Sequence, residues 1–264
     1  MLSLKEIASF FPPELRRFPQ FMLREYLQCK LLEIIYSSRY GSSLCFLGGT
    51  CLRLVHGNRR FSEDVDFDNL GLERDEFPAL AKLIKKQFQR EGYEVEIKVV
   101  TRDAWHCYIR FPGVLFQEGL SGYREEKIMI RLDAESQSFD YRPERFILNK
   151  FDVFTTILTT PLSLLLSQKL YAIVSRQRKQ GRDFFDAVFL MGRGVKPDYD
   201  FLRAKLGIGD GVVLKKVILE ECSSLDMEKL ARDVEPFLFD PKDKQKVIKF
   251  ADYLRQIKLK MGTP

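Results

Sequence analysis

Residues 44–68 read LCFLGGTCLRLVHGNRRFSEDVDFD, a stretch that combines an apolar run, a double glycine and alternating carboxylates. The apolar run 44–47 predicts a short strand that ends at Gly48 and Gly49. Thr50 then stands where a helix N-cap is expected, ahead of residues with an apolar helical face. A strand that turns on glycines into a helix start exposes backbone N–H groups, which bind phosphate together with the helix dipole. The pattern therefore predicts a phosphate cradle made by Gly48, Gly49 and Thr50.

The end of this stretch predicts a strand with carboxylates on one face. Side chains alternate along a strand, so Asp64, Asp66 and Asp68 share one face while Val65 and Phe67 fill the other. Carboxylates crowded on one face repel one another unless a divalent cation lies between them. Oxygen ligands of this kind suit Mg²⁺ that holds a triphosphate. A glycine turn followed by a solvated acidic strand is the simpler alternative.

Two motifs together resemble a known family. The order strand, Gly-Gly-Thr, helix and Asp-x-Asp strand resembles the signature of the DNA polymerase β-like nucleotidyltransferase superfamily, and GGTCLRLVHGNRRFSEDVDF resembles the AbiEii/AbiGii toxins. Downstream, SQKLYAIVSRQRKQGRDFFDAVFL is similar to that family's Lys motif followed by its Arg-Asp-x-x-Asp motif. The resemblance implies an α/β (α+β) nucleotidyltransferase fold, with a small mixed sheet flanked by helices and followed by a C-terminal helical domain.

The resemblance also implies roles for individual residues. Two Mg²⁺ ions, with Mn²⁺ as the other candidate, would be held by Asp64, Asp66 and Asp133, and Asp133 would help to deprotonate the acceptor. Lys169 would reach the triphosphate, while Asp186 would fix Lys169 or contact the nucleotide. Asp68 is the alternative metal ligand. The complete expected site is Asp64, Asp66, Asp133, Lys169 and Asp186 for catalysis, with Gly48, Gly49, Thr50, Lys169, Arg176 and Arg182 for the nucleotide phosphates.

Several other segments have a predicted structure. Residues 93–111 predict a hairpin with a polar break at Thr101 to Asp103, and residues 127–134 and 145–160 predict further strands. In the strand 127–134, Met129, Arg131 and Asp133 share one face. We predict helices at 20–38, 75–91 and 162–180, a loop at 112–126, and about four helices over 198–260, the last at 242–260.

Some exposed-looking residues have two interpretations. Trp105, His106 and Tyr108 would stack on a base or, as is commoner for an aromatic strand face, fill the core. Arg59 and Arg60 would meet phosphates or, more simply, be solvated surface residues. Arg182 and Asp183 match the second motif or pair only with their neighbours.

We expect the chain to divide into a catalytic domain, residues 1–158, and a helical domain, residues 159–264, that completes the cleft. Lys169, Ile173 and Arg176 fall on one helix face. We therefore predict that Lys169 faces the acidic strand across the cleft.

Composition restricts the class of protein. The 264 residues are 45% hydrophobic, enough for a substantial core, and the net charge of +6 (pI near 9.0) suits nucleic acid or a merely solvated basic surface. Five scattered Cys, none with CxxC spacing, indicate neither a zinc site nor a disulfide framework, and two His are too few for a His-based metal centre. With no long apolar run, we expect a cytoplasmic protein that does not enter a membrane.

The leading hypothesis is a toxin that transfers a nucleotide from an NTP such as ATP or CTP to an acceptor hydroxyl. The family resemblance implies a tRNA 3′ end as the acceptor and a cognate antitoxin as a partner. The alternatives are transfer to a protein or a small molecule, and a non-catalytic module of the same fold that binds nucleotide or RNA.

Overall fold

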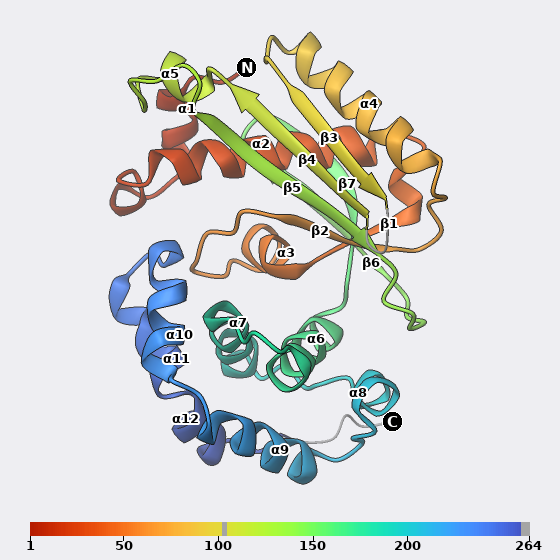
Figure 1. The fold of residues 1–264 in the computed structure, drawn as a ribbon, viewed down its shortest axis with the longest axis vertical. Helices are drawn as coiled ribbons and strands as arrows, with labels where there is room; N and C mark the ends of the chain where they lie inside the picture. The colour runs from red at the N-terminus through yellow and green to blue at the C-terminus, as the bar shows by residue number, and fades with distance from the viewer. Residues whose placement is uncertain (102–104, 260–264) are drawn as a thin grey trace. The chain divides into compact units, whose positions relative to one another are not determined.

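The computed structural model describes residues 1–101 and 105–259, and the chain divides into two compact units (Figure 1). The first unit comprises Met1–His56, Phe61–Ser138 and Pro143–Thr159; the second comprises Gly57–Arg60, Phe139–Arg142 and Thr160–Pro264. Part of the polar break predicted at 101–103, and the last residue of the helix predicted at 242–260, lie outside the described residues. The assignment of catalytic and cleft-completing roles to residues 1–158 and 159–264 stays a prediction.

A seven-stranded mixed sheet forms the centre of the first unit. Its strands run in the order β3-β4-β5-β2-β1-β7-β6. Strand β2 is antiparallel to β1 and parallel to β5, and β7 is parallel to β1. The bounds are β1 Leu44–Leu47, β2 Val65–Asn69, β3 Glu96–Thr101, β4 Trp105–Pro112, β5 Lys127–Glu135, β6 Glu144–Lys150 and β7 Val153–Thr159. The sheet therefore places the acidic strand β2 centrally, between the glycine-turn strand β1 and β5.

One face of this sheet is apolar and packs under helices. Val65, Ile109 and Leu132 on β2, β4 and β5 are fully buried, as are Leu31 of α2 and Ile84 of α4. Figure 1 shows α2 and α4 running along the same side of the strands. The helices of this unit are α1 Leu4–Ser9, α2 Pro19–Tyr36, α3 Gly48–Leu54, α4 Glu76–Arg90 and α5 Val114–Gln117.

Helices make up most of the second unit. Helices α6 and α7 pack on each other, and α10 and α11 pack on α7. The bounds are α6 Leu162–Ser175, α7 Gly181–Gly192, α8 Tyr199–Leu206, α9 Gly211–Ser223, α10 Met227–Val234, α11 Gln245–Ile248 and α12 Phe250–Gln256. The segment Gly57–Arg60 also belongs to this unit, where Arg60 forms a β-bridge with Leu238.

Some predicted elements differ from the structure. The segment 145–160 holds two strands, β6 and β7, because Phe151 adopts a left-handed backbone (φ 57°) that turns the chain back. The predicted loop 112–126 contains the short helix α5. The helix predicted at 162–180 ends at Ser175, where Lys179 Nζ donates to the Val174 carbonyl oxygen and caps it. Over 242–259, short helical turns replace the predicted continuous helix.

All five cysteines are buried, and none of them is in a disulfide bond. Burial raises the pKa of the Cys107 thiol to about 12.

Within 1–101 and 105–259, none of the helices has both the length and the apolar character needed to cross a membrane.

Candidate functional site

The glycine turn lies directly against the acidic strand. Leu47 is the register partner of Asp66, and the next residue, Gly48, has a left-handed backbone (φ +80°). A Cβ atom on Gly48 would lie only 2.2 Å from Asp66 Oδ2. Glycine is therefore required at this position for two reasons: the left-handed backbone conformation and the carboxylate beside it.

Thr50 does not cap the helix, contrary to the sequence prediction. Helix α3 begins at Gly48 with Leu47 as its N-cap residue, three residues before the N-cap position predicted at Thr50. Thr50 is fully buried in the first turn, and its hydroxyl donates to the backbone carbonyl of Asp64. The hydroxyl thus ties the start of the acidic strand to the glycine turn.

Strand pairing brings the predicted carboxylates onto one face of the sheet. Asp66 on β2 is directly opposite Asp133 on β5, and Asp133 is opposite His106 on β4. Because register partners on neighbouring strands point to the same side, these side chains form a row across three strands. Asp64 precedes β2 by one residue, and the side chains of Asp64 and Asp133 are 22% and 21% exposed. Solvent therefore reaches both carboxylates.

Two basic groups contact this acidic row. Arg131 Nη2 donates to Asp64 Oδ2 at 2.9 Å, and Arg131 Nε is 3.0 Å from Asp133 Oδ2. His106 Nδ1 donates to the other oxygen of Asp133 at 2.7 Å. Partial burial opposes the charge on Arg131, but Asp64, Asp133 and Asp66 raise the pKa of its guanidinium. The Arg131 guanidinium and the His106 hydrogen bond thus hold Asp64 and Asp133 in place.

The carboxylates fit a hard divalent metal by their chemistry. Mg²⁺ and Mn²⁺ prefer carboxylate oxygens, and Asp66 and Asp133 supply them from adjacent strands. Among the residues that the structure describes, no three His, Cys, Asp or Glu side chains are already grouped as metal ligands. Arg131 contacts Asp64 and Asp133, so the oxygens of these two carboxylates face a guanidinium. Asp68 is buried and accepts a hydrogen bond from the Gln137 backbone N–H at 2.8 Å, which gives it a structural role.

Helix α2 also positions the acidic strand, although its sequence carries no chemical motif. Gln28 is buried, and its amide nitrogen donates to the carbonyl oxygens of Ser62 at 3.0 Å and Glu63 at 2.9 Å. These two residues lead directly into Asp64. A buried amide with two backbone partners fixes the chain where the acidic residues begin.

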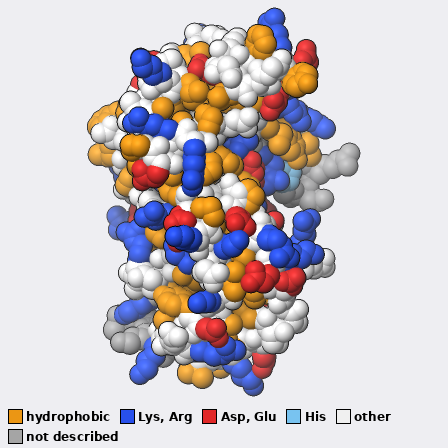
Figure 2. Space-filling view, turned by 90° about the vertical axis from the view of Figure 1, so that its left-hand side faces the viewer, with side chains coloured by type: hydrophobic (Ala, Val, Ile, Leu, Met, Phe, Trp, Pro, Cys, Tyr) orange, Lys and Arg blue, Asp and Glu red, His pale blue; other side chains and the backbone are white. Residues whose placement is uncertain are grey.

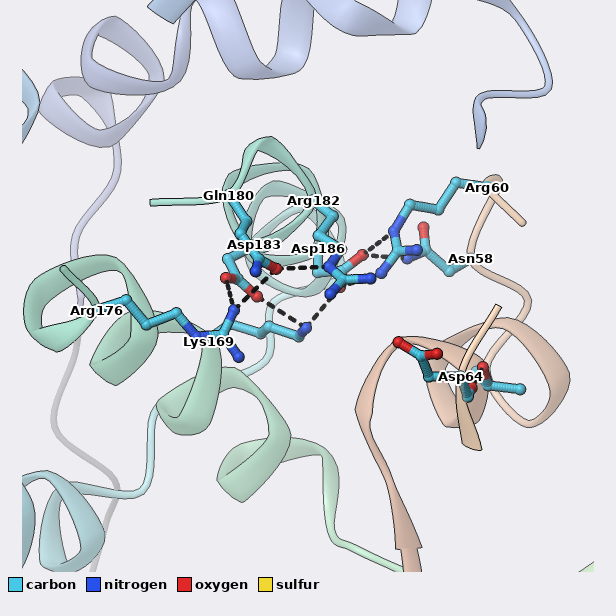
Figure 3. Close-up of polar contacts among 10 residues, drawn as sticks. Asn58, Arg60, Asp64, Lys169, Arg176, Gln180, Arg182, Asp183 and Asp186 are labelled. Atoms are coloured by element: carbon cyan, nitrogen blue, oxygen red, sulfur yellow. Dashed lines mark hydrogen bonds and ion pairs between the residues drawn. The ribbon is translucent and has the colours of Figure 1, made fainter. Parts of the chain in front are cut away.

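The second motif forms a buried ionic cluster in the helical unit (Figure 3). Lys169 Nζ of α6 lies 3.0 Å from Asp183 Oδ1 and 2.9 Å from Asp186 Oδ2, both on α7. Asp186 is fully buried and also accepts from Arg60 at 2.7 Å through each oxygen and from Asn58 Nδ2 at 2.7 Å. Of the two roles expected for Asp186, these contacts support the fixing of Lys169.

Arg60 corrects the sequence interpretation. Both expectations, a phosphate contact and a solvated surface, required an exposed side chain, but Arg60 is 1% exposed and paired with Asp186. Burial alone would raise the pKa of Asp186, but the charges of Arg60 and Lys169 and their hydrogen bonds hold it at about 2. The neighbouring Arg59 is exposed, which fits both a phosphate contact and a solvated surface residue.

The two remaining basic candidates bind within their own segment. Arg176 Nη1 contacts Asp183 and lies 3.2 Å from Gln180 Oε1. Arg176 follows the last residue of α6, whereas the sequence predicted that it lies within the helix. Arg182 Nε donates to Gln180 Oε1 at 2.7 Å. Asp183 is buried and contacts Lys169 on α6 and Arg176 just after α6, so its partners are not its sequence neighbours but include the lysine of the second motif.

The sequence did not predict the carboxylate contacts of four residues that shape these two groups: Asn58, Arg60, His106 and Arg131. Arg131 carried a usable signal, because alternation places it on the same face as Asp133. His106 was considered only for stacking or packing. Its contact with Asp133 depends on the register between strands β4 and β5, which cannot be read from the sequence. For Asn58 and Arg60, nothing local in the sequence indicates burial beside a carboxylate that is more than 120 residues away.

Solved structures support the fold. The chain has a TM-score of 0.54 and 15% identity to JHP933 from Helicobacter pylori, covering 89% of this chain and 90% of that chain. It has a TM-score of 0.54 and 17% identity to a proposed nucleotidyltransferase from H. pylori, covering 90% of this chain and 95% of that one. At these identities the likeness shows a shared fold. A search of curated protein sequences gives no match.

The family comparison covers most of the chain. The family model described as "Nucleotidyl transferase AbiEii toxin, Type IV TA system" matches residues 30–254, which include the glycine turn, the acidic strand and the Lys169–Asp186 cluster. The chain therefore belongs to the AbiEii family of nucleotidyltransferases, the toxins of type IV toxin–antitoxin systems.

Proposed function

We propose that this enzyme transfers an NMP from an NTP to a hydroxyl at the 3′ end of an RNA, with tRNA as the leading acceptor. The observation that carries the proposal is the in-register row of Asp66 and Asp133, with Asp64 beside it and Gly48 against Asp66. Carboxylates and a glycine turn in this arrangement suit a nucleotide triphosphate bound with a divalent metal. Membership of a nucleotidyltransferase family supports the reaction class.

The metal would be Mg²⁺, held by Asp64, Asp66 and Asp133, with Mn²⁺ as a substitute. When bound, it would neutralise charge on the triphosphate and polarise the reacting phosphate. In the proposed reaction the acceptor oxygen attacks the α-phosphorus, and the bond to the departing pyrophosphate breaks. Asp133 takes the proton of the acceptor hydroxyl, while His106 keeps that carboxylate oriented through Nδ1.

The remaining motif residues act on the phosphates. Backbone N–H groups at Gly48 and Gly49 would bind the β- and γ-phosphates, since the first N–H groups of a helix have no partner within it. Thr50 contributes its backbone only, because its hydroxyl is bonded to Asp64. We propose that Lys169 supplies a positive charge to the triphosphate and that Asp186 positions Lys169. This role requires both units to meet the same nucleotide, which stays a prediction.

A direct assay tests this function. The purified protein is incubated with Mg²⁺, each labelled NTP in turn, and total tRNA, a protein mixture or small hydroxyl compounds as acceptors. We expect label in tRNA with one NTP preferred, and none with Asp66→Asn, which removes a charge without removing volume. Label only in protein or in small molecules would reject the RNA acceptor. The absence of label and of pyrophosphate under every condition would reject transferase activity in this protein.

A further inference from the structure

Arg131 joins two of the three carboxylates that the proposed function assigns to the metal. It lies two residues before Asp133 on β5 and reaches Asp64 Oδ2 at 2.9 Å and Asp133 Oδ2 at 3.0 Å. A guanidinium presents its N–H groups in a rigid planar fork, so one side chain satisfies two separated carboxylates. A lysine at this position would offer a single point charge and would not bridge them in the same way.

The same carboxylate oxygens are needed by a divalent ion. A cation that approaches Asp64 and Asp133 meets a fixed positive charge within about 3 Å of the oxygens that it must bind. The contact is only partly desolvated, because the Arg131 side chain is 35% exposed. Arg131 therefore competes with a metal for these carboxylates but can leave them when a better anionic partner arrives.

A nucleoside triphosphate is such a partner. It brings several negative charges and its own affinity for the metal, so it repels the carboxylates and attracts the guanidinium. Arg131 shares its sheet face with Tyr108, its register partner on β4, and the Tyr108 side chain is half-buried rather than covered. Solvent thus borders the side on which the released guanidinium would meet phosphate.

We propose that Arg131 makes metal binding conditional on the nucleotide: it is the counter-ion of Asp64 and Asp133 in the free enzyme and passes to the triphosphate when metal and NTP bind together. The proposal rests on the proposed function, because it takes Asp64, Asp66 and Asp133 as the metal ligands. Its consequence is thermodynamic coupling. NTP tightens metal binding beyond the effect of its own phosphates, and the metal tightens NTP binding by the same factor.

The experiment measures metal affinity directly rather than activity. Mn²⁺ binding is followed by electron paramagnetic resonance or calorimetry, with and without a non-hydrolysable NTP analogue, in the wild type and in Arg131→Gln. We expect Arg131→Gln to tighten Mn²⁺ binding in the absence of nucleotide on the order of tenfold. The factor by which the analogue tightens Mn²⁺ binding should fall by a similar amount. Arg131→Lys, which keeps the charge but not the fork, should lie between the two proteins.

Arg110→Gln is the matched control. Arg110 lies on the same face of the neighbouring strand β4 and contacts the Tyr108 ring rather than the carboxylates, with its guanidinium carbon 5.8 Å from the ring centroid. Removing this charge should change Mn²⁺ affinity by less than about twofold, since a charge that solvent reaches and that does not contact the carboxylates is strongly screened. Thermal melts with and without Mg²⁺ report folding. Mg²⁺ should raise the Tm of Arg131→Gln more than that of the wild type.

The measurements separate a failure of the proposed Arg131 role from a failure of the metal site itself. If Arg131→Gln binds Mn²⁺ more weakly, Arg131 is a scaffold that holds the carboxylates in place, and the proposal is wrong. Unchanged affinity and unchanged coupling also overturn it. If the wild type binds no Mn²⁺, or if Asp66→Asn binds it as well as the wild type, the proposed metal site itself fails. If Asp66→Asn loses Mn²⁺ binding but Arg131→Gln binds Mn²⁺ as the wild type does, the metal site stands and only the proposed role of Arg131 is rejected.

Discussion

At the scale of single residues, Gly48 is the position where the smallest change should have the largest effect on activity. A Cβ atom there would lie 2.2 Å from Asp66 Oδ2, and the φ of +80° disfavours any other residue. We expect Gly48→Ala to displace the Asp66 carboxylate and lower kcat by about 100-fold or more, since misplacement of a reacting group by about 1 Å can have that effect. Steady-state assay of nucleotide transfer measures it.

Gly92→Ala separates the backbone effect from the steric effect. Gly92 has an equally unusual φ of +90°, but a Cβ atom there meets nothing within 4 Å. This control should cost about 1 kcal/mol of stability and leave kcat unchanged. Equal kcat in the Gly48→Ala protein and the wild type would show that Asp66 does not depend on the glycine turn.

Asp186 gives a prediction about pH. Its pKa is held at about 2, below the ordinary value of 3.8, so folding favours the ionised form. A lowered folded pKa stabilises the protein above about pH 4, and this stabilisation is lost as the pH falls through 2. We expect Asp186→Asn to lose about 3 to 5 kcal/mol of unfolding free energy at pH 6, because Arg60 and Lys169 stay buried. The difference in unfolding free energy between the wild type and Asp186→Asn should become smaller by about 2 kcal/mol as the pH falls towards 2.

Urea unfolding from pH 6 to pH 2 measures this difference. Asp200→Asn is the control, because the Asp200 side chain is 81% exposed in its pair with Arg203. Exposed pairs contribute about 0 to 1 kcal/mol, so this variant should follow the wild type at every pH. A gap between Asp186→Asn and the wild type that stays constant with pH would contradict the lowered pKa of Asp186.

At the scale of elements, the start of α7 is fixed by its packing on α10. A Cβ atom on Gly181 would lie 1.8 Å from the Leu230 carbonyl oxygen, a backbone atom that cannot rotate away. We expect Gly181→Ala to push the two helices apart and to cost about 2 to 3 kcal/mol. Asp183 follows two residues later on α7, so its contact with Lys169 should also be disturbed. Thermal or urea unfolding measures the loss of stability.

Gly192, at the other end of α7, is the matched control. A Cβ atom there would be 3.8 Å from Tyr253 Oη, an ordinary contact. Alanine is the better helix former, so Gly192→Ala should be neutral or stabilising by up to about 1 kcal/mol. If both substitutions have the same effect, helix propensity rather than packing on α10 governs the start of α7.

How far the sequence predicts these elements depends on how local their causes are. The strands β2 and β5 and helix α4 follow from alternation and helical spacing within short windows, and the structure has them. The β6–β7 turn was missed because it depends on a left-handed Phe151, a residue without any turn preference. The site followed the same rule. The carboxylates were visible as a pattern, whereas Arg131 bridging Asp64 and Asp133 requires the parallel pairing of β2 with β5.

At the scale of the whole molecule, the net charge of +6 is the difference between 43 Lys and Arg residues and 37 Asp and Glu residues. On the face shown in Figure 2, basic and acidic side chains are intermixed. The Lys-rich C-terminal tail, residues 242–260, is a candidate surface for RNA phosphates, but several of its lysines have acidic partners: Lys244 lies 2.9 Å from Glu235, and Lys246 lies 2.9 Å from Asp243. Among the described residues of this tail, Lys242, Lys249 and Lys258 are exposed and form no ion pair. These three are the better candidates for phosphate contacts.

If RNA is the acceptor, its binding should depend steeply on salt, because basic side chains release counterions when they bind phosphate. With about three phosphate contacts to a single strand, raising salt from about 50 to 200 mM should weaken RNA binding by roughly 20-fold, measured by fluorescence anisotropy. NTP binding should change far less, because carboxylates and metal dominate it.

Replacing Lys242, Lys249 and Lys258 with Gln assigns this dependence to residues. The triple variant should bind RNA more weakly at low salt and lose most of the salt dependence, since each lost contact removes one released counterion. Lys244→Gln with Lys246→Gln is the control. These lysines are already neutralised by Glu235 and Asp243, so their loss should change RNA affinity less than the triple variant does. Transfer of the nucleotide to a small acceptor should survive in both proteins. If RNA affinity is flat with salt, or if both variants bind RNA like the wild type, this segment does not bind RNA, and a protein or small-molecule acceptor becomes the better hypothesis.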